Sequence, residues 1–302
     1  MDFARLRALA AVAREGSVTA AAESLNYSQP TISHHLARLE HEVGVTLTTR
    51  VGRGLELTQA GRLLAARAEE ILGQLESARS EVAAYAGLTA GRLRLAAFPS
   101  ALATIVPLAT ARFATLYPAI DVALTEAEPP DAITALRSGE VDVAVVFRHG
   151  EAETPAYRDV TASPVLSEPL YVVTAAARRW SGERTNLATY QGERWIGGCD
   201  RCRTHLLTSC ERAGFRPTIG FETDDFVATQ ALVAAGLGVS TLPGLALRAS
   251  RNPGVRIDRL PGDARVVEVA TYGGSTLPVA TAAFLDVLKE LTAHPITWPR
   301  SG

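Results

Sequence analysis

The hydrophobic pattern of this chain changes its period once, near residues 87–91. Before that point, apolar residues recur every three or four positions, which is the period of an amphipathic helix. After it, alternating and β-branched runs are typical of strands, with helical stretches between them. With 302 residues, the chain has room for roughly two or three domains. We therefore expect a helical N-terminal part followed by an α/β part.

Residues 1–57 predict three short helices and a hairpin. Helical patterns cover 3–13 and 18–25, and Ser28 is a favourable N-cap for a third helix, whose first turn holds Pro30. That helix ends at Gly44 and precedes a hairpin over 47–57, and its buried stripe is Ile32, Leu36, Leu39 and Val43. A helix, a tight turn and a second helix are typical of DNA-binding helix-turn-helix proteins.

The outward face of the third helix carries polar side chains that suit DNA recognition. Serine and threonine hydroxyls can bind several base edges, and arginine prefers guanine or phosphate. The candidate contacts are Pro30, Thr31, Ser33, His34 and Arg38, with Arg50 and Arg53 on the hairpin. A solvated helix face and a charged turn are the alternative, because residues 1–57 carry as many acidic side chains as arginines. The net charge of −2 disfavours a protein that binds nucleic acid by bulk charge alone.

Residues 58–86 predict one long helix with Thr58 as its N-cap. Apolar residues at alternating steps of four and three form a heptad seam over Leu64, Ala68, Ile71, Leu75, Ala78 and Val82. We expect this seam to pair two copies of the chain, because a dimer presents two recognition helices to two DNA half-sites. Packing of the helix on its own domain is the alternative. The whole linker covers 58–91, with a hinge at 87–91.

The remainder of the chain alternates strands and helices, which predicts an open α/β sheet. One subdomain is expected over 92–163 with 267–302, and a second over 164–266. Two crossovers, near 163–168 and 262–266, would leave a cleft between these subdomains. Such clefts bind small molecules outside the carboxyl ends of the strands.

The segments 25–40, 42–47 and 50–61 resemble the LysR-type transcriptional regulators. The most specific match is Ser-Gln-Pro-Thr-Ile-Ser at 28–33, followed by Leu-x-x-Leu-Glu at 36–40. The resemblance implies a winged helix-turn-helix, a linker helix and two α/β subdomains like those of a periplasmic binding protein. It places five residues at the DNA major groove, Gln29, Pro30, Thr31, Ser33 and His34, and puts Arg50 and Arg53 on the wing. Ser28 is also counted among the DNA-binding residues. It also implies a cytoplasmic dimer or tetramer without a resident cofactor, whose partners are double-stranded DNA, a small-molecule effector and RNA polymerase.

The same resemblance places the effector against several loops of the α/β part. The candidate contacts are Pro99, Ser100, Ala101, Thr125, Phe147, Arg148, Cys199, Asp200, Cys202 and Asp224. Backbone N–H groups at 98–101 and the guanidinium of Arg148 would suit an anion. Glu126 and Asp200 would suit a basic group instead, so both kinds of effector stay open. Helix capping, surface charge and packing are the alternative roles of these residues.

Three cysteines are an odd count, which excludes a disulfide framework and favours reducing cytosol. Cys199 and Cys202 form a C-x-x-C motif, and a helix starting at Cys202 would lower the pKa of its thiol. Such a helix holds Cys202 and Cys210 about 12 Å apart, too far for a disulfide without unfolding. The position is similar to that of the cysteines in peroxide-sensing members of the family. Ordinary thiols, a redox pair and a zinc site completed by His205 all stay open.

The sequence lacks the motifs of serine hydrolases, zinc proteases and nucleotide-binding enzymes. We therefore expect a regulator, with no catalytic residues and no metal. Two other classes are alternatives: a thiol oxidoreductase built on Cys199 and Cys202, and a free solute-binding protein. The first would leave residues 1–57 unexplained, and the second should carry a secretion signal. No membrane span is expected, since the longest uncharged run, 226–247, contains glycine, proline and polar residues.

Overall fold

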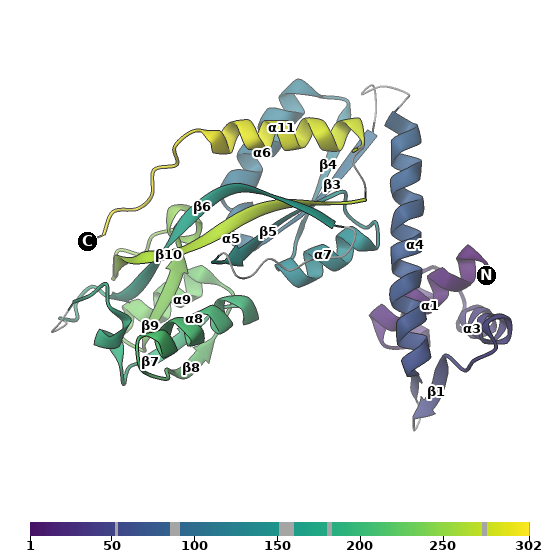
Figure 1. The fold of residues 1–302 in the computed structure, drawn as a ribbon, viewed down its shortest axis with the longest axis horizontal. Coiled ribbons are helices and arrows are strands. Elements are labelled where there is room, and N and C mark those ends of the chain that lie inside the picture. The colour runs from purple at the N-terminus through teal and green to yellow at the C-terminus, as the bar shows by residue number, and fades with distance from the viewer. Residues whose placement is uncertain (52–53, 85–90, 151–159, 180–182, 274–276, 302) are drawn as a thin grey trace. The chain divides into compact units, whose positions relative to one another are not determined.

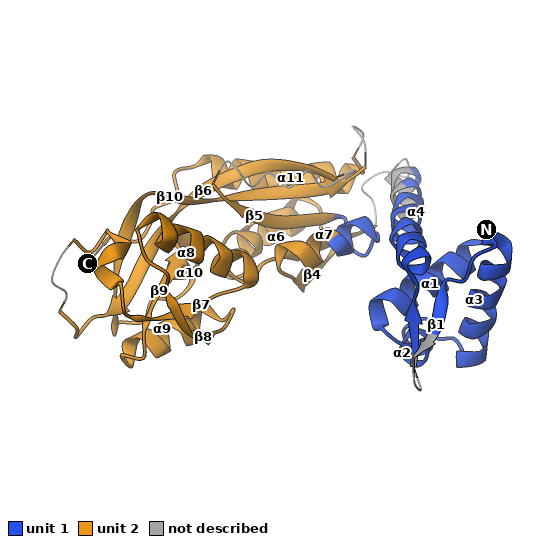
Figure 2. Cartoon of the chain, turned by 60° about the horizontal axis from the view of Figure 1, so that its bottom comes forward, with its two compact units in different colours: residues 1–86, 134–142 blue, residues 87–133, 143–302 orange. Residues whose placement is uncertain are grey.

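The computed structural model describes residues 1–51, 54–84, 91–150, 160–179, 183–273 and 277–301. The chain forms two compact units, residues 1–86 with 134–142 and residues 87–133 with 143–302 (Figure 2). Helices dominate the first unit, and the second is built on a mixed sheet of eight strands. Among the described residues, no helix has the length and apolar character needed to cross a membrane.

Three helices and a two-stranded hairpin open the first unit: α1 Phe3–Glu15, α2 Val18–Ser24, α3 Gln29–Val43, β1 Thr48–Val51 and β2 Gly54–Leu57. Both ends of α3 form as the sequence predicts. Ser28 Oγ accepts the N–H of Thr31 at 3.3 Å, and Gly44 ends the helix with a φ of 71°. Glycine adopts this left-handed conformation without steric cost. Of the predicted stripe, Ile32, Leu36 and Leu39 are buried, and Val43 is half-buried.

Glu40, near the end of α3, holds the start of the hairpin. Its Oε1 atom accepts hydrogen bonds from the backbone N–H groups of Leu47 at 2.8 Å and Thr48 at 2.9 Å. The hydroxyl of Thr48 donates to the same oxygen at 3.0 Å. Bonds to an ionised carboxylate are stronger than neutral ones. One acidic side chain therefore fixes the hairpin against α3.

The long helix α4 (Gln59–Ala84) follows the hairpin directly. Thr58 caps it as predicted, since Thr58 Oγ1 accepts the N–H of Gly61 at 3.0 Å. Gly61 lies so close to the chain at Leu47 that an added Cβ would stand 2.0 Å from the Leu47 carbonyl oxygen. The absence of a side chain at Gly61 therefore lets α4 begin against the base of the hairpin.

The predicted heptad seam of α4 divides into two parts. Ala68 is fully buried, and Leu64 and Ile71 pack against the same core, which α1 also lines. At these residues the helix packs on its own domain, which was the alternative to pairing with a second copy. Ala68 is therefore not available to a second copy of the chain. Leu75 is half-buried, whereas Ala78 and Val82 are exposed. Self-pairing through this second part stays a prediction.

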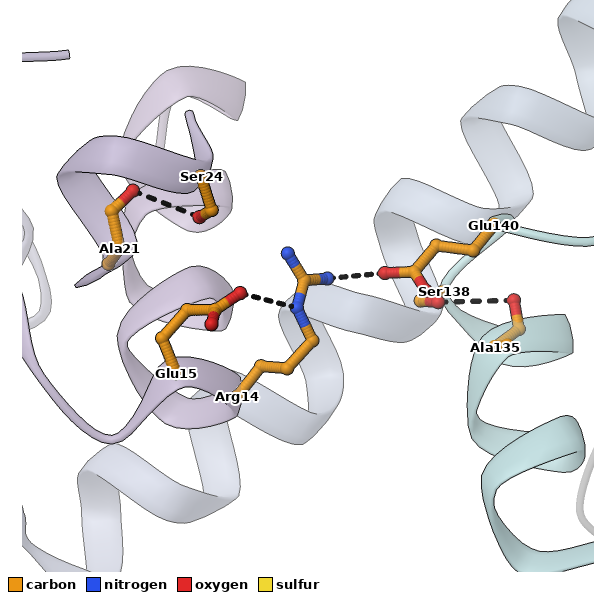
Figure 3. A network of polar contacts seen from close by, with 7 residues as sticks. All are labelled: Arg14, Glu15, Ala21, Ser24, Ala135, Ser138 and Glu140. Atoms are coloured by element: carbon orange, nitrogen blue, oxygen red, sulfur yellow. Dashed lines mark hydrogen bonds and ion pairs between the residues drawn. The ribbon is translucent and has the colours of Figure 1, made fainter. Parts of the chain in front are cut away.

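Exposed polar contacts add further links within the first unit (Figure 3). Arg14, near the end of α1, forms ion pairs with Glu15 at 3.2 Å and with Glu140. The Ser24 hydroxyl donates to the carbonyl of Ala21 at 3.1 Å. Exposed ion pairs contribute little to stability in water, so the apolar core is the main support of this unit.

The sheet of the second unit has the strand order β4-β3-β5-β10-β6-β9-β7-β8. Its strands are β3 Gly91–Ala97, β4 Ile120–Glu126, β5 Val143–His149, β6 Val160–Ala175, β7 Arg194–Gly197, β8 Thr218–Glu222, β9 Val239–Pro243 and β10 Val255–Tyr272. Its helices are α5 Pro99–Leu102, α6 Ile105–Leu116, α8 Asp200–Arg212, α9 Phe226–Ala234, α10 Gly244–Ala249 and α11 Val279–Ala293, with a 3₁₀ turn, η1, at Leu187–Tyr190. Helix α7, Pro129–Arg137, starts in this unit, and its last residues, 134–137, belong to the first unit. The predicted α/β fold is confirmed, although the sequence did not indicate η1 or α10.

Two long antiparallel strands, β6 and β10, join the two halves of this sheet (Figure 1). Their register shifts between Arg259 and Ala264, where Gly262 has a φ of 70°. The crossovers predicted near 163–168 and 262–266 lie within these strands. Charged residues mask the strand pattern over 255–265, so the sequence underestimates the length of β10.

The two halves of the second unit are called lobes here. The first lobe holds β3, β4, β5, α5, α6 and α11, and the second holds β7, β8, β9, α8, α9 and α10. In the second lobe, α8 starts before Cys202, where the sequence predicted the start of this helix. Helix α8 begins at Asp200 with Cys199 as its N-cap, and α9 is capped by Asp225, whose Oδ1 accepts the N–H of Val227 at 2.7 Å. Asp224 is therefore not needed as a cap.

Candidate functional site

A pocket of about 490 Å³, measured with its open mouth, is lined by both lobes of the second unit. Its walls come from the residues that follow β3, β4, β7 and β8 and from the end of β9. Open α/β sheets bind ligands outside the carboxyl ends of their strands, and this pocket lies at such ends.

Five of the ten predicted contacts line this pocket: Pro99, Ser100, Cys199, Cys202 and Asp224. Four others lie elsewhere. Ala101 is buried in the apolar core, and Thr125 is exposed on β4. Phe147 is buried on β5, and Asp200 is exposed beside the pocket, where it forms an ion pair with Arg203 at 2.8 Å.

The structure does not bring the tenth residue, Arg148, into the pocket. Its Nε donates to Glu268 Oε1 at 2.9 Å, and its Nη1 donates to the carbonyl of Gly150. The prediction that Arg148 binds an anionic effector is therefore wrong, because the Glu268 carboxylate already binds its guanidinium. The backbone N–H groups at 98–101 were expected to donate to an anionic effector. One of them, that of Ala101, already donates to the Phe98 carbonyl at 3.0 Å.

The pocket has a guanidinium that sequence reasoning missed, that of Arg265 on β10. Its side chain is 3% exposed and stacks on two rings, 4.7 Å from Phe98 and 4.2 Å from Phe147. Arg265 Nη2 donates to the Ser100 hydroxyl at 3.0 Å. The flat cation is thus held over aromatic faces, an arrangement in which the positive charge meets the electron-rich side of each ring.

Arg265 is paired with Glu168, which stands opposite it across the β10–β6 ladder. Arg265 Nε donates to Glu168 Oε1 at 2.8 Å, and the carboxylate is fully buried. Glu168 Oε2 accepts the N–H of Leu245 at 2.7 Å, so each carboxylate oxygen has a donor. A buried ion pair needs such additional bonds, because removing two charges from water costs several kcal/mol per ion. In the sequence, Glu168 lies in the predicted crossover 163–168 and Arg265 in the predicted crossover 262–266, which also holds Asp263.

Two carboxylates also line the pocket, and their negative charge is opposite to that of Arg265. Glu128 follows β4 in the first lobe, and Asp224 follows β8 in the second. Burial raises the pKa of Glu128, an effect that a hydrogen bond from Cys199 and the charge of Arg265 partly offset. Glu128 was not among the predicted contacts, since a lone acid between a strand and a helix carries no distinctive pattern.

The two thiols of the C-x-x-C motif meet in the pocket wall. The Cys199 thiol donates to Cys202 Sγ, and the sulfur atoms are 3.2 Å apart. This bond lowers the pKa of Cys202, with help from the charge of Arg265, while donating the bond raises the pKa of Cys199. The predicted direction for Cys202 therefore holds, but its main cause is the neighbouring thiol. Cys210 is buried apart from them, and burial raises its pKa to about 12.

His205 does not complete a zinc site with these thiols. Its Nε2 atom lies 2.8 Å from Asp263 Oδ1, and its ring stacks on that of His149 at 4.2 Å. Burial, and then the neighbouring His205, lowers the pKa of His149 to about 2. Within the described part of the chain, no group of three histidine, cysteine or acidic side chains is placed to share a metal ion.

The candidate DNA contacts lie in the first unit, on the face of α3 that is not packed. Gln29, Pro30, Ser33, His34 and Arg38 are exposed. Thr31 is half-buried, and its hydroxyl lies 2.8 Å from that of Ser28 at the start of the helix. Arg50 is on β1, but its side chain and all of Arg53 lie outside the described residues.

Both parts of the chain match known protein families. Residues 3–62 match the family described as bacterial regulatory helix-turn-helix protein, lysR family, and residues 86–293 match the LysR substrate binding domain. The chain belongs to the LysR family of transcriptional regulators. As a LysR-type regulator it combines a DNA-binding domain with an effector-binding domain. The family and the fold expected from the sequence are both confirmed.

Relatives of known name span most of this LysR-type chain. The HTH-type transcriptional regulator ClcR of Pseudomonas putida is 30% identical over 248 residues, which are 80% of this chain and 83% of ClcR. A hydrogen peroxide-inducible genes activator of Dickeya chrysanthemi is 28% identical over 83% of this chain and 82% of its own length. Full-length CbnR, solved in complex with its target DNA, has a TM-score of 0.55 at 26% identity and covers 97% of this chain and 100% of that one.

Proposed function

We propose that this LysR-type regulator binds its operator through α3 and the hairpin, and that a small molecule in the pocket of the second unit controls this binding. The observation that carries the proposal is the pocket itself. It lies at the strand ends and gathers Arg265, Ser100, Glu128 and Asp224 from distant parts of the chain. A few converging polar groups in a largely apolar cavity are typical of small-molecule sites.

The control is a shift between two arrangements of the lobes. A ligand that touches both lobes binds the closed arrangement better than the open one and so raises its population. The strands β6 and β10 run through both lobes, and the register shift near Gly262 is a suitable place for bending. Closure then changes how copies of the chain pack in a homodimer or homotetramer, and hence the spacing of the DNA half-sites.

The DNA end of the proposal rests on the exposed polar face of α3. Gln29, Ser33 and His34 are available there for the edges of bases, and Arg38 for guanine or phosphate. The DNA complex of the related CbnR supports the same role for this chain. In this proposal the regulator works in the cytoplasm, contacts RNA polymerase at the promoter, and uses no resident cofactor.

Thiol chemistry is the second candidate function, favoured by the 3.2 Å between the Cys199 and Cys202 sulfur atoms. The related hydrogen peroxide-inducible genes activator supports a sensor over an enzyme. A thiol oxidoreductase would leave the DNA-binding domain without a role. Turnover in an insulin-reduction assay would be required to support that enzyme.

A footprint combined with a ligand screen tests the leading proposal. The full-length protein is screened against small organic acids and amines by thermal shift, and each compound found is added to a DNase footprint on the DNA upstream of its own gene. We expect at least one compound to raise the melting temperature and to alter the footprint, because a ligand stabilises the state that it binds.

Filling the pocket supplies the control for that test. Thr241→Trp places a large ring in the pocket, since Thr241 lines it, whereas Thr208→Trp adds the same ring on the exposed face of α8. The Thr241 variant should lose the thermal shift and the footprint change, and the Thr208 variant should keep both. An unaltered ligand response in Thr241→Trp would place the effector elsewhere.

A further inference from the structure

We propose that the effector of this pocket is a small organic cation, an amine or guanidine with a compact apolar body, whose charged nitrogen binds between Glu128 of the first lobe and Asp224 of the second. The inference rests on the proposed function, because it assumes that a small molecule in the pocket controls DNA binding. It deepens that function by choosing between the acidic and the basic effectors that the sequence leaves open.

The charges in the pocket wall do not cancel. Among the described residues of this wall, Glu128 and Asp224 are acidic and Arg265 is basic. Glu168 already neutralises Arg265, since Glu168 Oε1 lies 2.8 Å from Arg265 Nε and 2.6 Å from Arg265 Nη2. The two carboxylates of the wall are therefore left for a ligand to neutralise. Binding partners have complementary potentials, so the pocket favours a cation over an anion.

A buried oxygen of Glu128 lacks a hydrogen-bond donor. Its Oε2 atom is buried and accepts no hydrogen bond from the described part of the chain. Buried polar groups are nearly always hydrogen-bonded, because an unmade bond costs the desolvation of the group. Burial also raises the pKa of this carboxyl group, and the Cys199 thiol and the charge of Arg265 offset that effect only in part. A positively charged N–H donor would supply both the missing hydrogen bond and the missing charge.

The approach to the pocket is acidic as well. A neighbouring hollow shares Glu128 and Asp224 with the pocket, and three further acidic side chains line it: Asp131, Asp200 and Glu222. Arg201 also lines this hollow, and Arg203 forms ion pairs with Asp200 at 2.8 Å and Glu222 at 2.9 Å. The carboxylates still outnumber these two arginines. A cleft with an excess of one charge raises the local concentration of ligands of the opposite charge.

The inner wall of the pocket limits the rest of the ligand. Its apolar side chains are those of Phe98, Phe226, Leu242, Pro243 and Ala246. A hydrated metal ion would leave this surface uncovered, and no three histidine, cysteine or acidic side chains of the described residues are placed to share a metal. A compact apolar body that carries one charged nitrogen fits both the apolar wall and the carboxylates.

The two carboxylates come from different lobes, so a cation between them also changes the arrangement of the lobes. Burial raises the pKa of Glu128 most, and the negative charge of Asp224 raises it further. The two carboxylates therefore repel each other, which favours separation of the lobes when no ligand is bound. One cation between them replaces this repulsion by two attractions. Its binding is thus coupled to closure, which is the step that the proposed function requires.

Probes that share a shape and differ in charge test the class of effector. Amines, carboxylic acids and alcohols on the same butyl, pentyl, benzyl and phenylethyl groups are compared at equal concentration and ionic strength by thermal shift on the full-length protein. We expect amines to raise the melting temperature and to alter the footprint, because a ligand stabilises the state that it binds. The matching acids and alcohols should do neither. A response to the acids in place of the amines would overturn the inference, as would an equal response to magnesium chloride.

Charge removal locates the response. Glu128→Gln keeps the shape of the side chain and should weaken amine binding by at least about tenfold, because hydrogen bonds to charged groups are the strong ones. Asp224→Asn, at a position exposed to water, should weaken it less. The matched control is Glu211→Gln, which removes a carboxylate from the exposed surface of α8 outside the pocket and should keep the response. An amine response that survives Glu128→Gln, or is lost equally in Glu211→Gln, would overturn the inference.

The same experiments separate the failure of this inference from that of the proposed function. If acids or alcohols alone shift the melting temperature and alter the footprint, the class of effector is wrong and the proposed function stands. If the unliganded protein gives no footprint, or no compound of any charge alters it, the proposed function fails.

Discussion

The two units of this regulator differ in how far apart along the chain their decisive contacts lie. In the first unit, Ser28 and Thr58 each cap a helix that starts at the next residue, and Glu40 reaches only to Thr48. In the second unit, Arg265 joins Ser100 across 165 positions of the sequence. Short-range contacts are visible as patterns in the chain. Long-range contacts depend on strand register, so the DNA-binding unit can be predicted from sequence in much more detail than the pocket.

The largest expected effect concerns the long-range contacts. Arg265→Met leaves the fully buried Glu168 without its counter-charge, which should cost about 3–5 kcal/mol of unfolding free energy. Urea unfolding followed by tryptophan fluorescence measures this, because all three tryptophans belong to the second unit.

The matched control is Arg112→Met, which breaks an exposed ion pair with Glu290 and should cost less than about 1 kcal/mol. A double variant, Arg265→Met with Glu168→Met, should recover much of the loss because no charge stays buried. Equal destabilisation by Arg265→Met and Arg112→Met would show that the central ion pair does not support the lobes.

A smaller effect is expected at the contact between Gly61 and Leu47 in the first unit. Gly61→Ala introduces a Cβ at 2.0 Å from the Leu47 carbonyl oxygen, so α4 or the hairpin must shift. Such overpacking costs about 1–3 kcal/mol. Thermal unfolding followed by circular dichroism should show the transition of the first unit lowered. Gly91→Ala, where an added Cβ meets no atom within 4 Å, should change stability by no more than about 0.5 kcal/mol. Similar losses in both variants would exclude steric contact as the cause.

The smallest effects separate folding from DNA recognition on one helix. Ser28→Ala removes the N-cap of α3 and should cost about 1 kcal/mol of stability. Ser33→Ala changes an exposed side chain, so stability should stay the same while discrimination between operator and random DNA falls by about 1 kcal/mol. Unfolding and competition footprints on both variants measure the two quantities. Unchanged discrimination in Ser33→Ala would remove Ser33 from the DNA contacts.

Sequence reasoning located most of the pocket segments but not their chemistry. Ser100, Cys199 and Cys202 were placed at the effector site by the family resemblance, and the structure shows that they line the pocket. Arg265 was missed because nothing near it in the sequence marks an inward-facing strand residue. Arg148 was expected at the pocket because the family resemblance places the segment after β5 there, yet Glu268 on the neighbouring strand holds its guanidinium. The position of a residue along a strand predicts at which end of the sheet it lies, but not which oppositely charged side chain it pairs with.

The seam of α4 shows the same limit within a single helix. A heptad pattern predicts which residues share a face, and Leu64, Ala68 and Ile71 do share one. It does not say what covers that face, because an intramolecular helix and a second copy bury apolar side chains equally well. The packing of α1 decided the matter for Ala68.

By itself, the sequence determined the helix-turn-helix, its caps, the α/β character of the second unit and the family. These follow from residue propensities, hydrophobic period and contacts within a few positions. Only the tertiary structure decided that Arg265 meets Glu168 and Ser100, and that the Cys199 and Cys202 thiols hydrogen-bond to each other in the pocket wall. The physical reason is that strand register and side-chain orientation arise from the packing of the whole unit, in which each residue is placed by neighbours that the sequence keeps far away.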